Sequence, residues 1–217
     1  MTNTDQHPTG SSVDTTVVEH PLVVDALARI RDVETPNSLF RQNLERIGML
    51  LLAEATRTLP TVDGTVTTPL TETSATRLAV QPVIVPILRA GLGFLAPAQQ
   101  LMPRAEIGFI GIARNEDTHE PEPYVNKLPD SLSGRPVIVV DPMLATGGSL
   151  IHTLELLLQR GADQPLTVVC ALCAPEGIAA VEESGISVRL FTAAIDDHLN
   201  ENAYIVPGLG DAGDRQF

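Results

Sequence analysis

The stretch 141–149 combines an acid, glycines and hydroxyl groups in an order that suits a phosphorylated sugar. The apolar run 138–140 ends in Asp141, and a Thr-Gly-Gly-Ser sequence at 146–149 opens a helix-like segment. Glycines let a backbone wrap closely around a ligand, and the free N–H groups at a helix start attract an anion. A carboxylate beside a phosphate repels it unless the acid faces ribose hydroxyls or a metal. The residues therefore predict phosphate on 146–149 and ribose toward Asp141.

Two arginines follow apolar runs in the same way. Arg89 comes after 83–88, and Arg114 comes after 110–113. If these runs are parallel strands, both arginines lie at the sheet edge that carries Asp141. Two guanidinium groups, which are always charged, suit a phosphate or a diphosphate. A surface ion pair is the alternative for a single arginine at a strand end.

The segment 207–215 is dense in glycine and holds Asp211 and Asp214. Backbone amides that glycine leaves accessible can read a planar heterocycle by shape and hydrogen bonds. A flexible tail is the alternative interpretation. Residues 208–213 also fit G-x-G-x-x-G, but that dinucleotide fingerprint needs a preceding strand and a full helix after it. The four residues that follow leave no room for one.

Composition excludes several classes of protein. The 217 residues include 14 Lys and Arg against 27 Asp and Glu, for a net charge of −13. Nucleic-acid binding needs a basic surface, so we expect no nucleic-acid partner. The positive residues are thirteen arginines and one lysine, Lys127. No P-loop pattern is present, and an anionic ligand must be held by arginine, by backbone N–H groups or through a metal ion.

Apolar runs alternate with helical patterns after residue 80, which is typical of an α/β protein with a parallel sheet flanked by helices. Strands are predicted at 81–88, 106–113, 135–141, 166–171 and 188–194. Helices are predicted at 92–102, 148–160 and 176–183, and earlier between 22 and 59 with a break at 35–38. We expect one domain over 17–217 after a disordered tail at 1–16. Residues 61–73 predict a loop or short strands, and the long polar segment 115–133 predicts an arm or flexible loop.

The remaining reactive residues indicate no further site. Cys170 and Cys173 lie in the predicted strand 166–171 or just after it, so we expect them on opposite faces as inert buried thiols in a cytoplasmic protein. Asp196-Asp197-His198 is interpreted as a solvated acidic turn, and we expect no protein-held metal. No apolar run approaches the length of a membrane span, and no secretory signal is seen, so no membrane partner is expected.

Several stretches resemble the uracil phosphoribosyltransferases, which belong to the type I phosphoribosyltransferase family. The similarity runs from about residue 20 to the end. Its two main motifs are DPMLATGGS at 141–149 and YIVPGLGDAGDR at 204–215. Shorter matches are PILRAGLG at 86–93, Phe40-Arg41, Ile47-Gly48, EATR at 54–57, KLP at 127–129 and APEG at 174–177.

The resemblance implies transfer of ribose 5-phosphate from 5-phospho-α-D-ribose 1-diphosphate to uracil, giving UMP and diphosphate in pyrimidine salvage. It implies catalytic roles for Asp211 and Arg114. Donor-binding residues would be Arg89, Arg114, Asp141, Pro142, Met143, Leu144, Ala145, Thr146, Gly147, Gly148, Ser149 and Asp211. Uracil-binding residues would be Ile205, Gly210, Asp211 and Ala212. The donor would carry Mg²⁺, and residues 195–217 would form a small C-terminal hood over the base.

The same resemblance implies regulation and assembly. Activity in the family is often raised by GTP, so GTP is expected as an effector, although the residues identify no GTP contacts. Subunits pair through an arm, which predicts a homodimer or a higher homo-oligomer, and 115–133 is the segment expected to form that protruding arm. Family members usually continue a few residues past Phe217, so this C-terminus is expected to be short or trimmed. Asp141 is followed by Pro142 where many phosphoribosyltransferases carry a second acid, and this version is the one typical of uracil enzymes.

Three alternatives remain open at this point. A purine phosphoribosyltransferase would need a larger hood with an aromatic side chain, and aromatic residues make up 3% of the chain. An RNA-binding regulator on this fold would need a basic surface, against which the charge of −13 counts. A nucleotide sensor without catalysis would have no need of intact donor and base motifs.

Overall fold

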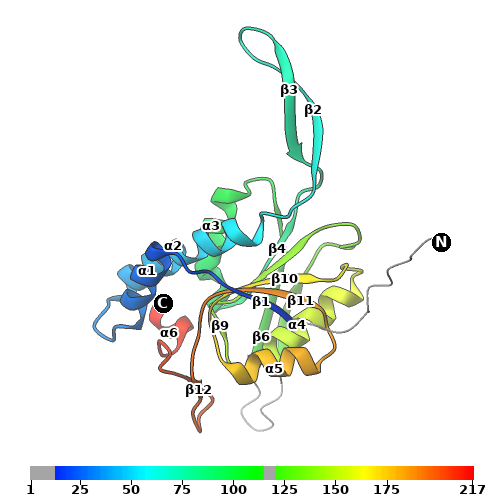
Figure 1. The fold of residues 1–217 in the computed structure, drawn as a ribbon. Helices are drawn as coiled ribbons and strands as arrows, with labels where there is room; N and C mark the ends of the chain where they lie inside the picture. Colours follow the sequence, from blue (N-terminus) through cyan, green and yellow to red (C-terminus); the bar gives the residue numbers. More distant parts are fainter. Residues whose placement is uncertain (1–12, 115–120) are drawn as a thin grey trace, which may run out of the picture.

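The computed structural model describes residues 13–114 and 121–217, and a twisted sheet runs through its centre (Figure 1). The strand order is β1-β11-β10-β8-β4-β6-β7, and all neighbours pair in parallel except β6 and β7. The bounds are β1 Val13–Val17, β11 Val188–Ile195, β10 Leu166–Cys173, β8 Val137–Val140, β4 Val83–Leu88, β6 Phe109–Arg114 and β7 Pro121–Lys127. Two short strands extend it, β5 (Glu106–Ile107) beside β4 and β9 (Met143–Leu144) beside β10.

Helices cover both faces of this sheet, which confirms the predicted α/β class. One face packs against α1 (Pro21–Arg31), α2 (Asn37–Ala55), the 3-10 helix η1 (Ala90–Phe94) and α3 (Leu95–Leu101). The other face packs against α4 (Gly148–Gln159) and α5 (Pro175–Glu183). The central strand β10 is buried along its whole length, which explains its continuous apolar sequence. No helix in the described part of the chain is long and apolar enough to cross a membrane.

The protruding element is a hairpin of β2 (Thr61–Thr67) and β3 (Glu72–Leu78), which projects away from the sheet (Figure 1). Both of its faces are largely exposed to solvent. The described part of the segment expected as an arm or flexible loop, residues 121–133, is thus not the projecting element. Residues 121–127 of that segment form β7, which pairs with β6 at the sheet edge, and 115–120 lie outside the described residues. Prolines at 121 and 123 fit there because an edge strand leaves one row of backbone groups unpaired.

The N-terminal prediction needs a correction as well. Residues 13–17, expected to belong mostly to a disordered tail, form strand β1 beside β11. Its polar residues Asp14, Thr15 and Thr16 fit an edge position that is only half covered. The remainder of the predicted tail, residues 1–12, lies outside the described part of the chain.

Cys170 and Cys173 are buried and free, as expected, but they share one side of β10. The backbone N–H groups of Ala171 and Leu172 both donate to the carbonyl oxygen of Pro142, at 2.8 and 3.0 Å. This irregularity, typical of a β-bulge, interrupts the alternation of side chains. The thiols therefore meet, and the hydrogen bond with Cys173, together with burial, raises the pKa of Cys170.

Candidate functional site

Three charged residues stand at the carboxyl ends of adjacent strands, as the sequence predicted. Arg89 follows β4, Arg114 ends β6 and Asp141 follows β8, and β4 lies between the other two strands. Arg89 is exposed, and its guanidinium lies 4.0 Å from the carboxylate of Asp214. The structure describes the backbone of Arg114 but not its side chain. This edge is where open α/β sheets bind ligands.

The 141–149 loop joins β8 to α4 and is held by backbone contacts. The N–H of Ala174 donates to the carbonyl oxygen of Leu144 at 2.8 Å, besides the two bonds that Pro142 accepts. Gly147 caps α4 with φ of +85°, a left-handed conformation that favours glycine. Thr146 and Ser149 are exposed at the start of α4, where free N–H groups and hydroxyls can meet an anion.

Asp141 lies half-buried at the start of this loop. Burial raises the pKa of its carboxyl to about 7, and the negative charge of Asp211 adds to the rise. The backbone N–H of Met143 donates to the carboxylate and acts in the opposite direction. Two carboxylates that repel each other across a cleft favour a bound cation or hydroxyl donors between them.

Residues 195–217 form a hood beside the loop, which Figure 1 shows in orange and red. It consists of a small hairpin, β12 (His198–Leu199) with β13 (Ile205–Val206), followed by a turn and α6 (Ala212–Gln216). Asp211 caps α6, because its carboxylate accepts the N–H of Asp214 at 2.9 Å. The alternative interpretation of 207–215 as a flexible tail is thus wrong, because the segment is structured.

The end of the hood is tied to the helical layer by Arg215 and Gln216. Arg215 donates to the carbonyl oxygens of Ile30 at 2.5 Å and Leu209 at 3.0 Å, and its guanidinium lies 4.6 Å from the centre of the Phe40 ring. Gln216 is fully buried and donates to the carbonyl oxygens of Ala90 and Ala212, at 3.1 and 2.8 Å. These bonds fix the hood against η1 and α1.

A cavity of about 310 Å³ opens between the 141–149 loop and the hood. Its lining combines residues from η1, the loop and the hood: Ala90, Met143, Ala145, Asn202, Ala203, Tyr204, Ile205, Gly210, Asp211, Ala212 and Gly213. All four residues predicted for uracil are among them. So are Met143, Ala145 and Asp211 from the set predicted for the donor. The mixed polar and apolar lining suits a small planar heterocycle and part of a sugar.

The other residues predicted for the donor lie outside this lining. Pro142 and Leu144 are buried, and their carbonyl oxygens accept bonds from β10 or its end, so they shape the loop from within. Arg89, Arg114, Asp141, Thr146, Gly147, Gly148 and Ser149 lie at the strand ends or the start of α4. They follow the same edge of the sheet as the 141–149 loop, whose residues Met143 and Ala145 line the cavity.

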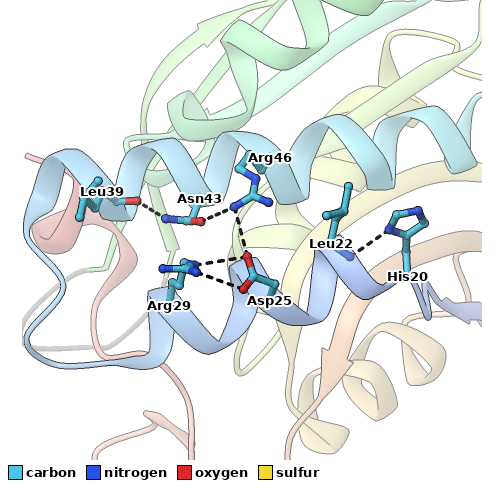
Figure 2. A network of polar contacts seen from close by, with 7 residues as sticks. All are labelled: His20, Leu22, Asp25, Arg29, Leu39, Asn43 and Arg46. Carbon is cyan, nitrogen blue, oxygen red and sulfur yellow. Dashed lines mark hydrogen bonds and ion pairs between the residues drawn. The ribbon is translucent and has the colours of Figure 1, made fainter.

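A second cavity, of about 330 Å³, lies over α1, α2 and α3 and is mainly apolar. Its one arginine, Arg46, already contacts Asn43 at 3.0 Å and Asp25 at 3.4 Å (Figure 2). It contains none of the residues that sequence analysis singled out. We therefore assign the chemistry to the cavity beside the 141–149 loop.

One ion pair beside the hood escaped the sequence analysis. Asp196, interpreted as part of a solvated acidic turn, is 7% exposed and pairs with Arg31 at the end of α1. The two residues are separated by 165 positions, so no local spacing could have indicated the contact. In the described residues no group of three or more His, Cys, Asp and Glu side chains could hold a metal ion.

Comparisons with known proteins identify similar sequences and a similar solved structure. A family model described as uracil phosphoribosyltransferase matches residues 17–217. A uracil phosphoribosyltransferase of Corynebacterium diphtheriae is 53% identical over 93% of this chain and 95% of its own. One of Corynebacterium glutamicum is 51% identical over 94% and 97%. The solved structure of the AQ2163 protein from Aquifex aeolicus has a TM-score of 0.88 and 38% identity, over 94% of this chain and 97% of that one.

Proposed function

The chain belongs to the uracil phosphoribosyltransferase family, and we infer from this that it transfers ribose 5-phosphate from 5-phospho-α-D-ribose 1-diphosphate to uracil, giving UMP and diphosphate. It is a glycosyltransferase. The observation that carries this conclusion in the structure is the cavity between the 141–149 loop and the hood, because the two long motifs of the family form its walls. We place the reaction there, within pyrimidine salvage.

The donor occupies the strand edge and the 141–149 loop in this proposal. Its 5-phosphate lies on residues 146–149, where the start of α4 offers backbone N–H groups and the hydroxyls of Thr146 and Ser149. Asp141 accepts the ribose hydroxyls. Arg89 and Arg114 hold the diphosphate. They stand at the ends of β4 and β6, the two strands that come after β8 in the sheet order, and the end of β8 carries Asp141.

Uracil occupies the hood side of the cavity, against Ile205, Gly210, Asp211 and Ala212. One edge of uracil presents an acceptor, a donor and an acceptor. Backbone groups that offer N–H, C=O and N–H in matching order would reject cytosine, whose N3 and exocyclic amine reverse two of these roles. Ala212 is buried, so its short side chain leaves room for the ring.

Catalysis then rests on positioning and electrostatics. Uracil N1 forms a bond to the anomeric carbon as the bond to the diphosphate oxygen breaks, and the proton of N1 is released to solvent. Asp211 faces the positive charge that develops on the ribose, and Arg114 faces the negative charge of the leaving diphosphate. No covalent nucleophile is required.

A Mg²⁺ ion fits the donor set as a companion of the substrate. The carboxylates of Asp141 and Asp211 lie close enough for their charges to interact, and hard oxygen ligands of this kind suit Mg²⁺. In the described residues the protein itself brings together no metal-binding cluster, so the ion would be held mainly by the diphosphate. When bound, it neutralises the leaving group.

Assembly and setting follow from other features. The β2–β3 hairpin is exposed on both faces, and a lone two-stranded hairpin is marginally stable in water, so we assign it to contact with a second copy in a homodimer or higher homo-oligomer.

The cellular setting that we propose is the cytoplasm. Cys170 and Cys173 contact each other but form no disulfide, which fits a reducing compartment. Activation by GTP remains an expectation from the family.

One assay tests the function directly. The purified protein is mixed with phosphoribosyl diphosphate, Mg²⁺ and single bases, with and without GTP, and nucleotide products are separated by chromatography. We expect UMP from uracil, and far less product from cytosine or from purines. Turnover of a purine without turnover of uracil would overturn the assignment, and omission of Mg²⁺ tests the metal separately.

A further inference from the structure

Arg31 and Asp196 form a closed ring of hydrogen bonds with the backbone of Gly208. The guanidinium of Arg31 donates to both carboxylate oxygens of Asp196, at 2.5 and 2.8 Å. Arg31 also donates to the carbonyl oxygen of Gly208 at 2.8 Å. The N–H of Gly208 donates to Asp196, again at 2.8 Å. Both backbone polar groups of one residue are thus held by one ion pair.

The two side chains come from rigid parts of the fold. Arg31 is the last residue of α1, where a cation is favoured by the helix dipole, and Asp196 follows directly after β11. The side chain of Asp196 is 4% exposed and that of Arg31 is 24% exposed. Charge-assisted, bidentate pairs in such surroundings are strong and geometrically specific. The ring of hydrogen bonds therefore fixes Gly208 relative to the end of α1 and the end of β11.

Gly208 stands in the middle of the turn that shapes the base side of the cavity. Ile205 precedes it by three residues, Gly210 follows by two, and both line the cavity. Gly208 has φ of +61°, and a Cβ atom there would overlap the carbonyl oxygen of Ile205. The turn is consequently tight, and a shift of Gly208 moves both cavity residues together.

We propose that Arg31 and Asp196 are positioning residues that set the uracil-binding half of the site without touching substrate. The 141–149 loop is held by other contacts, through Ala171, Leu172 and Ala174. Loss of the ring therefore weakens uracil binding far more than donor binding. This inference rests on the proposed reaction and adds the residues that govern its specificity for the base.

Asp196→Asn tests the proposal at constant side-chain volume. An amide has one accepting oxygen, so its NH₂ group must face a donor of Arg31 in either orientation, and in one orientation it also faces the N–H of Gly208. We expect the KM for uracil to rise about tenfold or more, from the loss of bonds to a charged group, while kcat and the KM for phosphoribosyl diphosphate change less than about twofold. Arg31→Lys keeps the charge without the fork, and should give a smaller rise.

The matched control is Asp25→Asn, on the same helix as Arg31. Asp25 pairs with Arg29 at 3.2 Å in the exposed network of Figure 2, with no hydrogen bond to the hood. The Asp25→Asn variant should leave the KM values for uracil and for phosphoribosyl diphosphate unchanged. The melting temperature of each variant is recorded in parallel, because a purely structural role would lower it without separating the two substrates.

The possible outcomes are distinct. An unchanged KM for uracil in Asp196→Asn, or an equal rise for both substrates, would overturn the positioning role while leaving the reaction intact. If Asp196→Asn fails to fold, Arg31→Lys carries the test, and equal effects on both substrates count against the proposal in the same way. A wild-type protein that makes no UMP would instead overturn the reaction itself.

Discussion

The Cα atom of Gly177, in the first turn of α5, lies so close to the carbonyl oxygen of Ala145 that a Cβ atom at position 177 would overlap it. Ala145 belongs to the 141–149 loop and lines the cavity. Only a residue without a Cβ atom at position 177 allows the 141–149 loop to pack this closely against α5. The contact explains why the Ala-Pro-Glu-Gly segment at 174–177 accompanies the donor motif in the sequence.

We expect Gly177→Ala to displace the loop and to raise the KM for phosphoribosyl diphosphate about tenfold, because small misplacements of bound groups are costly in catalysis. The KM for uracil should change less, since Gly208 and the hood are held by other contacts. Steady-state kinetics with each substrate varied in turn provide the measurement. Glu183→Ala, an exposed change on the same helix, is the control. Unaltered donor kinetics in Gly177→Ala would show that the loop tolerates the shift.

The substitution Ala212→Val should act on the opposite substrate. Ala212 is 3% exposed and lines the cavity where we place uracil. Two added methyl groups would take up space that the uracil ring needs or disturb the wall beside it, so we expect the KM for uracil to rise about tenfold and the KM for the donor to change little. Ala179→Val, at an exposed position of α5, serves as the control. Equal losses for both substrates would contradict the separation of the two half-sites.

The central strands could be predicted from the sequence because burial on both faces leaves a continuous apolar run. The sequence predicts a strand at 166–171, and the observed strand is Leu166–Cys173. Edge strands lack this signal. β1 has Asp14 and two threonines, and β7 carries prolines at 121 and 123, so tertiary pairing and not local pattern decides both. The sequence predicts only a loop or short strands over 61–73, where the structure has a hairpin that reaches Leu78.

The site was predictable where topology alone brings residues together. Arg89, Arg114 and Asp141 each follow an apolar run, and parallel strands place such ends at one edge. The contact between Arg31 and Asp196 depends instead on how α1 packs beside the end of β11, across 165 positions. A single sequence contains no signal for that pairing. The same holds for Gln216, whose burial against Ala90 follows from the docking of α6.

Glu176 anchors the hood hairpin to α5, since its carboxylate accepts the N–H of Leu199 at 2.9 Å. That bond is the main reason why the pKa of Glu176 lies below its usual value, with its own backbone N–H contributing. We expect faster amide hydrogen exchange at Leu199 in Glu176→Ala, and near wild-type exchange in Glu176→Gln, which keeps an accepting oxygen. Glu182→Ala, an exposed change on the same helix, should have no effect. Slow exchange in Glu176→Ala would mean that the β12–β13 pairing holds Leu199 without this anchor.

The carboxyl of Asp141 should make donor binding depend on pH near neutrality. Burial raises its pKa to about 7, and the charge of Asp211 contributes. The pKa in the folded state thus lies above the ordinary aspartate value of 3.8, so the protonated form dominates below about pH 7. The stability that this proton contributes falls as the pH rises from the ordinary value and is lost once the pH passes about 7. Only the ionised form can accept ribose hydroxyls with both oxygens and attract the cation that accompanies the donor.

We therefore expect the KM for phosphoribosyl diphosphate to fall between pH 6 and 8 in the wild-type protein. In Asp141→Asn it should be higher throughout and should follow only the titration of the donor itself, which is common to both proteins. The melting temperature offers an independent readout with the opposite sign. Without ligand, the wild type should lose stability relative to Asp141→Asn as the pH rises from 6 to 8, because the carboxylate becomes charged in a buried place beside Asp211. Parallel pH profiles for the two proteins, in KM and in melting temperature, would show that Asp141 is ionised over this whole range and that its environment does not hold the proton.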